Sequence, residues 1–164
     1  MSADPPTIDH VLATLRSTPL RLAELTASCS PEQLGAAPAP GEWSVTDVLA
    51  HLRACADVWG GSIARILSED TPAFRYVSPR TWFRKTDYPN WTFDAALTAL
   101  TEQRSVLLAR LDSLPPEAWR RTANVTKSGK LRVETVLSYA GGMANHEIVH
   151  LDQIALTVEA ACHH

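Results

Sequence analysis

Hydrophobic residues recur at steps of three and four in four long segments of the chain, which is the spacing of amphipathic helices. Between these segments the period is lost, and proline, glycine or serine marks most of the breaks. Little of the alternation that predicts strands occurs elsewhere. The pattern therefore predicts an all-α fold, a four-helix bundle, with helices at about residues 7–27, 44–67, 92–114 and 133–161.

Individual residues predict where these helices begin and end. Pro19 should kink or interrupt the first helix, because it cannot donate a hydrogen bond to the preceding turn. Ser44 is a good N-cap for the second helix, with Asp47 as its capping-box partner three residues later. Thr92 can cap the third helix, which the prolines at 115 and 116 end.

A long crossover connects the second and third helices. In residues 68–90 prolines alternate with aromatic residues and the helical period disappears. A connection of this length is unusual in a compact domain unless it has a function. It either packs over one side of the bundle or forms a wall or lid of a substrate pocket. Farther along, residues 124–130 carry a turn signal that predicts a small hairpin.

Length and charge limit the class of protein. The 164 residues fit one domain, residues 1–164, that is large enough to bury a core. Hydrophobic residues make up 45% and charged residues 20%, as is ordinary for globular proteins. The net charge of −3 argues against a nucleic-acid partner. No apolar run approaches the roughly 20 residues of a membrane span, so no membrane partner is expected.

Cysteine usage and the chain ends bear on localisation. The chain has three cysteines, an odd number, and none of them are in a CxxC motif, so no disulfide framework is expected. They are Cys29, Cys55 and Cys162. The first six residues lack the basic start and apolar block of a signal peptide. These features predict a cytoplasmic protein. His163 and His164 at the C-terminus are assigned no role.

A pair of histidines in the fourth helix is the main candidate for chemistry. His146 and His150 are four residues apart, so a helix places both imidazoles on one side, where they can share a metal ion. His51 lies on the flank of the second helix, as the pair does on the fourth. The alternative is that each histidine is an ordinary surface or hydrogen-bonded residue.

The histidine pair also fits H-E-x-x-H, the zinc-peptidase motif, with Glu147 as general base. A peptidase of this type needs a substrate-binding edge strand and a further ligand downstream, and neither is visible. Glu147 also falls toward the apolar face of its helix, where it can pair with an arginine instead. We therefore do not favour the peptidase interpretation.

Three motifs in order resemble the DinB-like superfamily, the DinB/YfiT-type group of metal-binding four-helix bundles. They are Gly41-Glu42-Trp43-Ser44-Val45, His51-Leu52, and His146-Glu147-x-x-His150-Leu151-x-Gln153-Ile154. The resemblance covers nearly the whole chain, including the long crossover. It implies an up-down-down-up bundle and a divalent metal, often zinc or nickel, held by His51, His146 and His150.

Three protein ligands leave coordination positions open, as in catalytic zinc sites. Characterised members of the group include thiol S-transferases and isomerases that use low-molecular-weight thiols such as bacillithiol or mycothiol. The resemblance therefore implies a metal-dependent thiol S-transferase acting on small molecules. The alternatives are a metal-dependent hydrolase and a stress-response or binding module without turnover. A homodimer is a further expectation, since such bundles often associate through helix faces.

Four residues near the histidines have candidate roles. Gln153, one turn beyond His150, can contact a ligand or a water beside the metal. Glu147 is the candidate general base. Asp47 can orient the second ring nitrogen of His51, although capping is the simpler role. Cys55 is expected in the core, because free cysteine behaves as a small hydrophobe.

Overall fold

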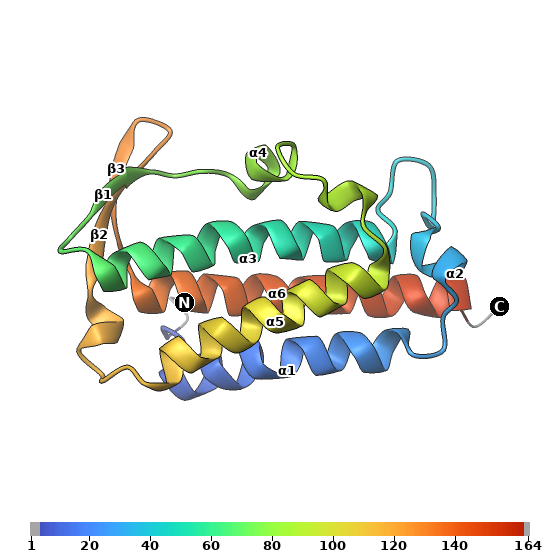
Figure 1. Ribbon diagram of the computed structural model, residues 1–164, viewed down its shortest axis with the longest axis horizontal. Helices are drawn as coiled ribbons and strands as arrows, with labels where there is room; N and C mark the ends of the chain where they lie inside the picture. The colour runs from blue at the N-terminus through green and yellow to red at the C-terminus, as the bar shows by residue number, and fades with distance from the viewer. Residues whose placement is uncertain (1–3, 163–164) are drawn as a thin grey trace.

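The computed structural model describes residues 4–162, and four long helices form a bundle within this range (Figure 1). The second and third of them run in the same direction, and the first and fourth run the opposite way. The predicted up-down-down-up bundle with a long crossover is therefore confirmed. The four helices are α1 (Ile8–Thr26), α3 (Val45–Ser68), α5 (Phe93–Asp112) and α6 (Val136–Cys162).

The predicted caps account for where the helices begin. The Ser44 side chain accepts a hydrogen bond from the Asp47 backbone, and the Asp47 carboxylate accepts one from the Ser44 backbone, so the capping box is present. The Thr92 side chain caps α5 by accepting a hydrogen bond from the Ala95 backbone N–H. Pro19 lies inside α1, which continues on both sides of it, so of the predicted kink or interruption the interruption is wrong and the kink stays a prediction.

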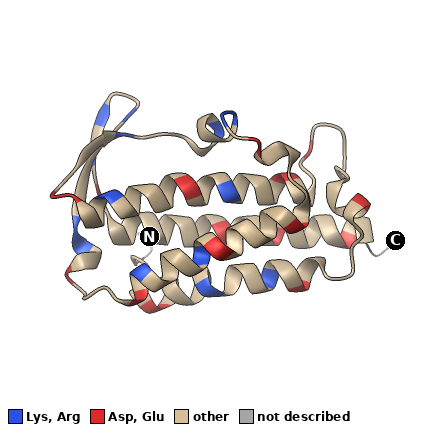
Figure 2. Ribbon diagram, viewed as in Figure 1, with Lys and Arg blue, Asp and Glu red and all other residues tan. Residues whose placement is uncertain are grey.

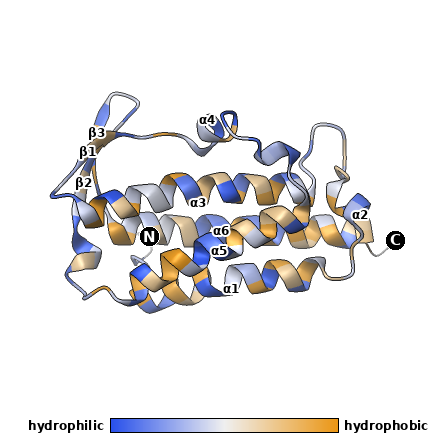
Figure 3. Cartoon of the chain, viewed as in Figure 1, coloured by the Kyte–Doolittle hydropathy of each residue, from blue (hydrophilic) through white to orange (hydrophobic). Residues whose placement is uncertain are grey.

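The core fills the space between the helices in two groups of buried residues, one near each end of the bundle. Figure 3 shows apolar residues alternating with polar ones along each long helix, as amphipathic helices require. Helix α1 packs against α5 and α6, and α3 packs against the same two helices. Each long helix therefore packs against two of the other long helices. Members of the two groups include Leu15, Ile63, Trp119 and Met143 in one, and Leu22, Leu49, Leu100 and Ile154 in the other.

The crossover and the predicted hairpin join in one small sheet at an end of the bundle (Figure 1). The hairpin consists of β2 and β3, which pair antiparallel as predicted. The crossover adds β1, which pairs parallel with β2 and had no signal of its own. The fourth helix begins at residue 136, not 133, because the preceding residues pair in β3. The bounds are β1 Ala73–Arg75, β2 Thr122–Lys127 and β3 Lys130–Thr135.

Short helices complete the connections. The crossover contains α4 and a single 3₁₀ turn, η1, which lie along α3. A second 3₁₀ turn, η2, precedes the hairpin, and α2 links α1 to α3. Their bounds are α2 Pro31–Gly35, α4 Pro79–Phe83, η1 Tyr88–Asn90 and η2 Ala118–Arg120.

Charged residues of both signs are interspersed along the helices in Figure 2. Their mixture is consistent with the small net charge of −3 over the chain. In the part of the chain that the structure describes, no helix combines the length and the apolar character needed to cross a membrane.

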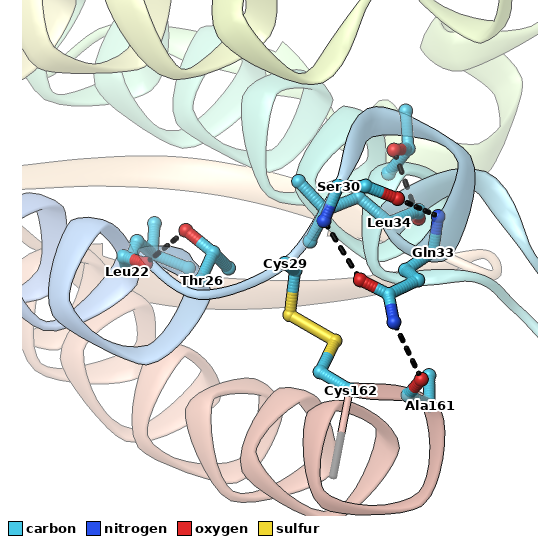
Figure 4. Close-up of a disulfide and its surroundings, with 9 residues drawn as sticks. Leu22, Thr26, Cys29, Ser30, Gln33, Leu34, Ala161 and Cys162 are labelled. Carbon is cyan, nitrogen blue, oxygen red and sulfur yellow. Dashed lines mark hydrogen bonds between the residues drawn. A yellow bond between two sulfur atoms is a disulfide. The ribbon is translucent and has the colours of Figure 1, made fainter. Parts of the chain in front are cut away.

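A disulfide bond joins Cys29 to Cys162, contrary to the expectation from the odd cysteine count (Figure 4). The bond connects the segment before α2 to the last residue of α6, across 133 positions of sequence. Beside it, the Gln33 side chain donates a hydrogen bond to the Ala161 carbonyl oxygen, with a distance of 3.1 Å. The odd cysteine is Cys55, which remains free. His163 and His164 lie outside the described residues.

Candidate metal centre

The structure brings together all three histidines that the sequence singles out. His51 comes from α3, and His146 and His150 come from α6, the helix packed beside it. The Nε2 atom of His146 lies 3.2 Å from Nε2 of His51 and 3.1 Å from Nε2 of His150. Three imidazole nitrogens therefore converge on one small volume between two packed helices.

Burial keeps two of these rings neutral. Desolvation, and secondarily the nearby charge of His150, lowers the pKa of both His51 and His146 to about 4. The positive charge of Arg80 lowers the pKa of His51 by a further, smaller amount. At neutral pH both rings are therefore neutral, so each has one ring nitrogen without a proton. Only such a nitrogen can bind a metal.

Gln153 fixes the orientation of His150. The Gln153 Oε1 atom lies 2.8 Å from Nδ1 of His150. Because an amide oxygen only accepts hydrogen bonds, Nδ1 carries the proton, and the Nε2 lone pair of a neutral His150 ring faces His146. Outer partners of this kind commonly set the ring position and tautomer of metal-binding histidines.

Hydrogen bonding alone does not satisfy this cluster. A ring nitrogen presents either one N–H or one lone pair in the ring plane, so His146 Nε2 can bond to only one of its two neighbours. The Nδ1 atom of His146 is buried and has no hydrogen-bond partner among the described residues. Two zinc-bound imidazole nitrogens at about 2.1 Å from the metal would lie about 3.4 Å apart in a tetrahedron. The two separations from His146 are close to this value, so the three histidines fit a divalent metal.

A cavity of about 400 Å³ opens onto the histidine cluster. The indole rings of Trp43 and Trp59 form part of its wall, at ring-centroid distances of 5.1 Å from His51 and 5.0 Å from His146. Crossover residues close another side. The crossover therefore packs along α3 and also forms a wall of this cavity, and a substrate in the cavity stays a prediction. The complete lining is Trp43, His51, Cys55, Trp59, Tyr76, Ser78, Pro79, Arg80, His146 and His150.

Asp57 on α3 holds this wall in place. Its carboxylate accepts hydrogen bonds from the indole N–H of Trp82 at 2.9 Å and from the Tyr88 hydroxyl, both in the crossover. Arg53 and Gln103 donate to the same carboxylate. One side chain therefore ties both α4 and η1 to the helix that carries His51. No periodic pattern predicts this arrangement, since Trp82 and Tyr88 lie in an aperiodic segment.

Glu147 points away from the cavity, into the bundle core, with only 2% of its surface exposed. It forms an ion pair with Arg104 of α5, and Thr18 of α1 donates a hydrogen bond to it at 2.6 Å. Of the two roles considered for Glu147, pairing with an arginine is the one that its contacts show. Asp47 likewise has the simpler of its roles, because its carboxylate caps α3.

Cys55 lies closer to the histidines than a core role predicts. It is buried, and its Sγ atom lies 3.5 Å from Nε2 of His51. The ligand atoms of His51, Cys55 and His146 all lie within 4.8 Å of one another. Burial, and to a smaller extent the charge of Glu147, raises the pKa of the Cys55 thiol to about 12. The signal for this position was the i, i+4 spacing of a cysteine after a histidine, which matches the His146 and His150 spacing.

The chain belongs to the DinB superfamily, whose pattern it matches over residues 14–154. Its structure is similar to that of YfiT from Bacillus subtilis, with a TM-score of 0.75 at 22% sequence identity. The similarity covers 96% of this chain and 90% of YfiT, and at this identity it establishes the fold. YfiT is described as a probable metal-dependent hydrolase with an unusual four-helix bundle topology. A comparison with curated protein sequences gives no match.

Proposed function

We propose that this chain is a divalent-metal-dependent enzyme for small molecules, and specifically a thiol S-transferase. His51, His146 and His150 would hold zinc or nickel through their Nε2 atoms. The observation that supports a metal is the position of His146 Nε2, which lies 3.2 Å from Nε2 of His51 and 3.1 Å from Nε2 of His150, with the His51 and His146 rings neutral at neutral pH. A bound divalent metal would supply a positive centre that holds a thiol sulfur as thiolate.

The composition of the cavity favours thiol transfer over hydrolysis. None of the residues that line it, within the described part of the chain, is Asp or Glu. Glu147, the nearest candidate in sequence, has its carboxylate engaged by Arg104 and Thr18. Attack by a water molecule commonly needs a positioned carboxylate or imidazole as general base, whereas a thiolate is already the nucleophile. In the transfer, the S–H proton passes to solvent, a carbon–sulfur bond forms and the leaving group departs with its electron pair.

Other residues of the chain would prepare this site. We propose that Gln153 acts as a positioning residue, because it fixes the tautomer of His150. Glu147 would set the position of α6 through its ion pair and would not serve as the base. Trp43 and Trp59 would exclude water, and Arg80 at the cavity wall would favour an anionic part of the substrate.

Metal-dependent hydrolysis is the second candidate, and the description of YfiT favours it. The predictions of a cytoplasmic location, a homodimer and a low-molecular-weight thiol partner stay predictions.

One experiment separates these functions. Metal-loaded protein is mixed with a bacillithiol- or mycothiol-type thiol and an aromatic halide electrophile, and thioether formation is followed. A parallel reaction contains a chromogenic ester and no thiol. We expect the wild-type protein to form thioether faster than the His150→Ala variant does. The matched control is His10→Ala, whose histidine is exposed on α1.

Ester cleavage alone would support the hydrolase. Metal binding with neither reaction would support a binding module without turnover.

A further inference from the structure

Two neighbouring helices each present a pair of potential metal donors one turn apart. On α6 the pair is His146 and His150, and on α3 it is His51 and Cys55. All four line the same cavity. Since i and i+4 positions lie on one face of a helix, each helix directs two donors toward the other helix.

Cys55 offers a sulfur donor close to the nitrogen donors of His51 and His146. With zinc bonds of about 2.3 Å to sulfur and about 2.1 Å to nitrogen, the two donors lie about 3.6 Å apart in a tetrahedron. Cys55 Sγ lies 3.5 Å from His51 Nε2, a separation of this size, and 4.0 Å from its Nδ1. The sulfur therefore lies beside the ring, and a rotation of the side chain is needed for both donors to share one metal. The ligand atom of His146 also falls within 4.8 Å of both. Among the described residues, the set of three donors that all lie within this distance of one another contains Cys55 rather than His150.

An ordinary core role explains this placement less well. A buried cysteine that only fills space packs its sulfur on aliphatic neighbours. Here the sulfur lies beside an imidazole ring on the wall of a cavity, in a cluster whose hydrogen bonds cannot all be made.

We propose that Cys55 is a fourth protein donor at this centre and binds the metal through Sγ as a thiolate. When it binds, the S–H bond breaks, the sulfur keeps the electron pair and the proton passes to solvent. The inference rests on the proposed function, because it requires the metal held by His51, His146 and His150.

A fourth donor changes the chemistry of the site. Three histidines leave one position open, whereas three histidines and a cysteine complete a tetrahedron. A thiolate also shifts preference toward softer metals such as zinc or cobalt and away from magnesium or calcium, which take oxygen donors. The centre would therefore be closed before substrate arrives, and a substrate donor would enter as a fifth ligand or in place of Cys55.

Cobalt substitution tests the inference without any activity assay. A variant with Cys29→Ser and Cys162→Ser removes the disulfide, so that Cys55 is the sole cysteine in the chain. This variant and the full wild-type chain are titrated with Co²⁺, and bound cobalt is counted by elemental analysis. A cobalt–thiolate bond gives charge-transfer absorption in the near ultraviolet. We expect this absorption in both proteins, and we expect Cys55→Ser to lose it while it still binds cobalt.

The possible outcomes separate this inference from the proposed function. Two outcomes would overturn the role of Cys55 and leave the histidine site intact. Either the wild type binds cobalt without charge-transfer absorption, or Cys55→Ser keeps that absorption. No cobalt bound to the wild type would overturn both. If Cys55→Ser fails to fold, Cys55→Ala replaces it, and circular dichroism confirms its helix content before titration.

Discussion

A buried polar network between α1, α5 and α6 gives the sharpest prediction about stability. Pro19 has no N–H to bond the Leu15 carbonyl oxygen four residues earlier. Arg104 donates to that oxygen instead, at 2.7 Å, and its guanidinium also pairs with Glu147. Thr18 completes the network with its bond to Glu147. The arginine and glutamate side chains are only 2% and 3% exposed, so each charge depends on the other.

Removing one partner leaves a charge buried without its counterion. For Glu147→Ala, Arg104 would keep only the Leu15 carbonyl and a contact with the Met143 sulfur. We expect the free energy of unfolding to fall by about 3–5 kcal/mol. Replacing both charged residues with Met should cost less than either single change, about 1–3 kcal/mol, because no charge is then left buried without its counterion. The remaining cost comes from the Leu15 carbonyl, which loses the bond from Arg104, while the Thr18 hydroxyl keeps its bond to the Thr14 carbonyl.

Urea unfolding followed by far-ultraviolet circular dichroism measures these differences. With a slope of about 2 kcal/mol per molar urea, a loss of 3–5 kcal/mol lowers the midpoint by roughly 2 M. The control is Asp112→Ala, which breaks the Arg16–Asp112 pair, whose side chains are 54% and 46% exposed. An exposed pair of this kind contributes less than about 1 kcal/mol.

Two results would refute the reasoning. One is a Glu147→Ala protein as stable as the Asp112→Ala control. The other is a double variant whose loss equals the sum of the two single losses, since the charges would then act independently.

Three further predictions concern the centre and the disulfide. The pKa values of His51 and His146 are lowered to about 4, so the unfolded chain takes up protons first as pH falls. The free energy of unfolding of metal-free protein should therefore decrease from about pH 6.5 to pH 4; a flat profile in urea melts would contradict this. Gln153→Ala should weaken metal affinity about 10–100-fold in competition with a chelator, and unchanged affinity would remove its positioning role. Cys29→Ser removes the disulfide, which closes a loop of 133 residues, and should lower the free energy of unfolding by about 2–5 kcal/mol. Reduced and oxidised wild-type protein with the same melting temperature would contradict a stabilising disulfide.

The sequence predicts most of the bundle because each long helix carries its own signals. Apolar spacing marks the inner faces, and Ser44 and Thr92 mark two helix starts through local hydrogen bonds. Pro19 shows the limit of such local rules. In place of the bond that Pro19 cannot make, Arg104 donates to the Leu15 carbonyl oxygen across 89 positions of sequence, and the helix continues.

The parts that were missed depend on contacts between distant segments. Strand β1 is three residues long and forms only because β2 offers it a partner. The disulfide requires Cys29 and Cys162 to meet at one end of the bundle, which a cysteine count cannot show. The histidine cluster was predictable because two of its members share a helix turn, whereas the closeness of Cys55 to it depends on side-chain packing.

Metal content tests the central claim most directly. Protein produced without a nickel column is dialysed, and its zinc and nickel are measured by elemental analysis beside His146→Ala, whose Nε2 atom lies between the other two. His10→Ala is the matched control. We predict about one equivalent of divalent metal per chain in the wild type and control, as for a site with three histidine ligands, and less than about a tenth in His146→Ala. A wild-type protein that stays metal-free after loading with zinc and nickel, or a His146→Ala protein that keeps a full equivalent, would contradict the account.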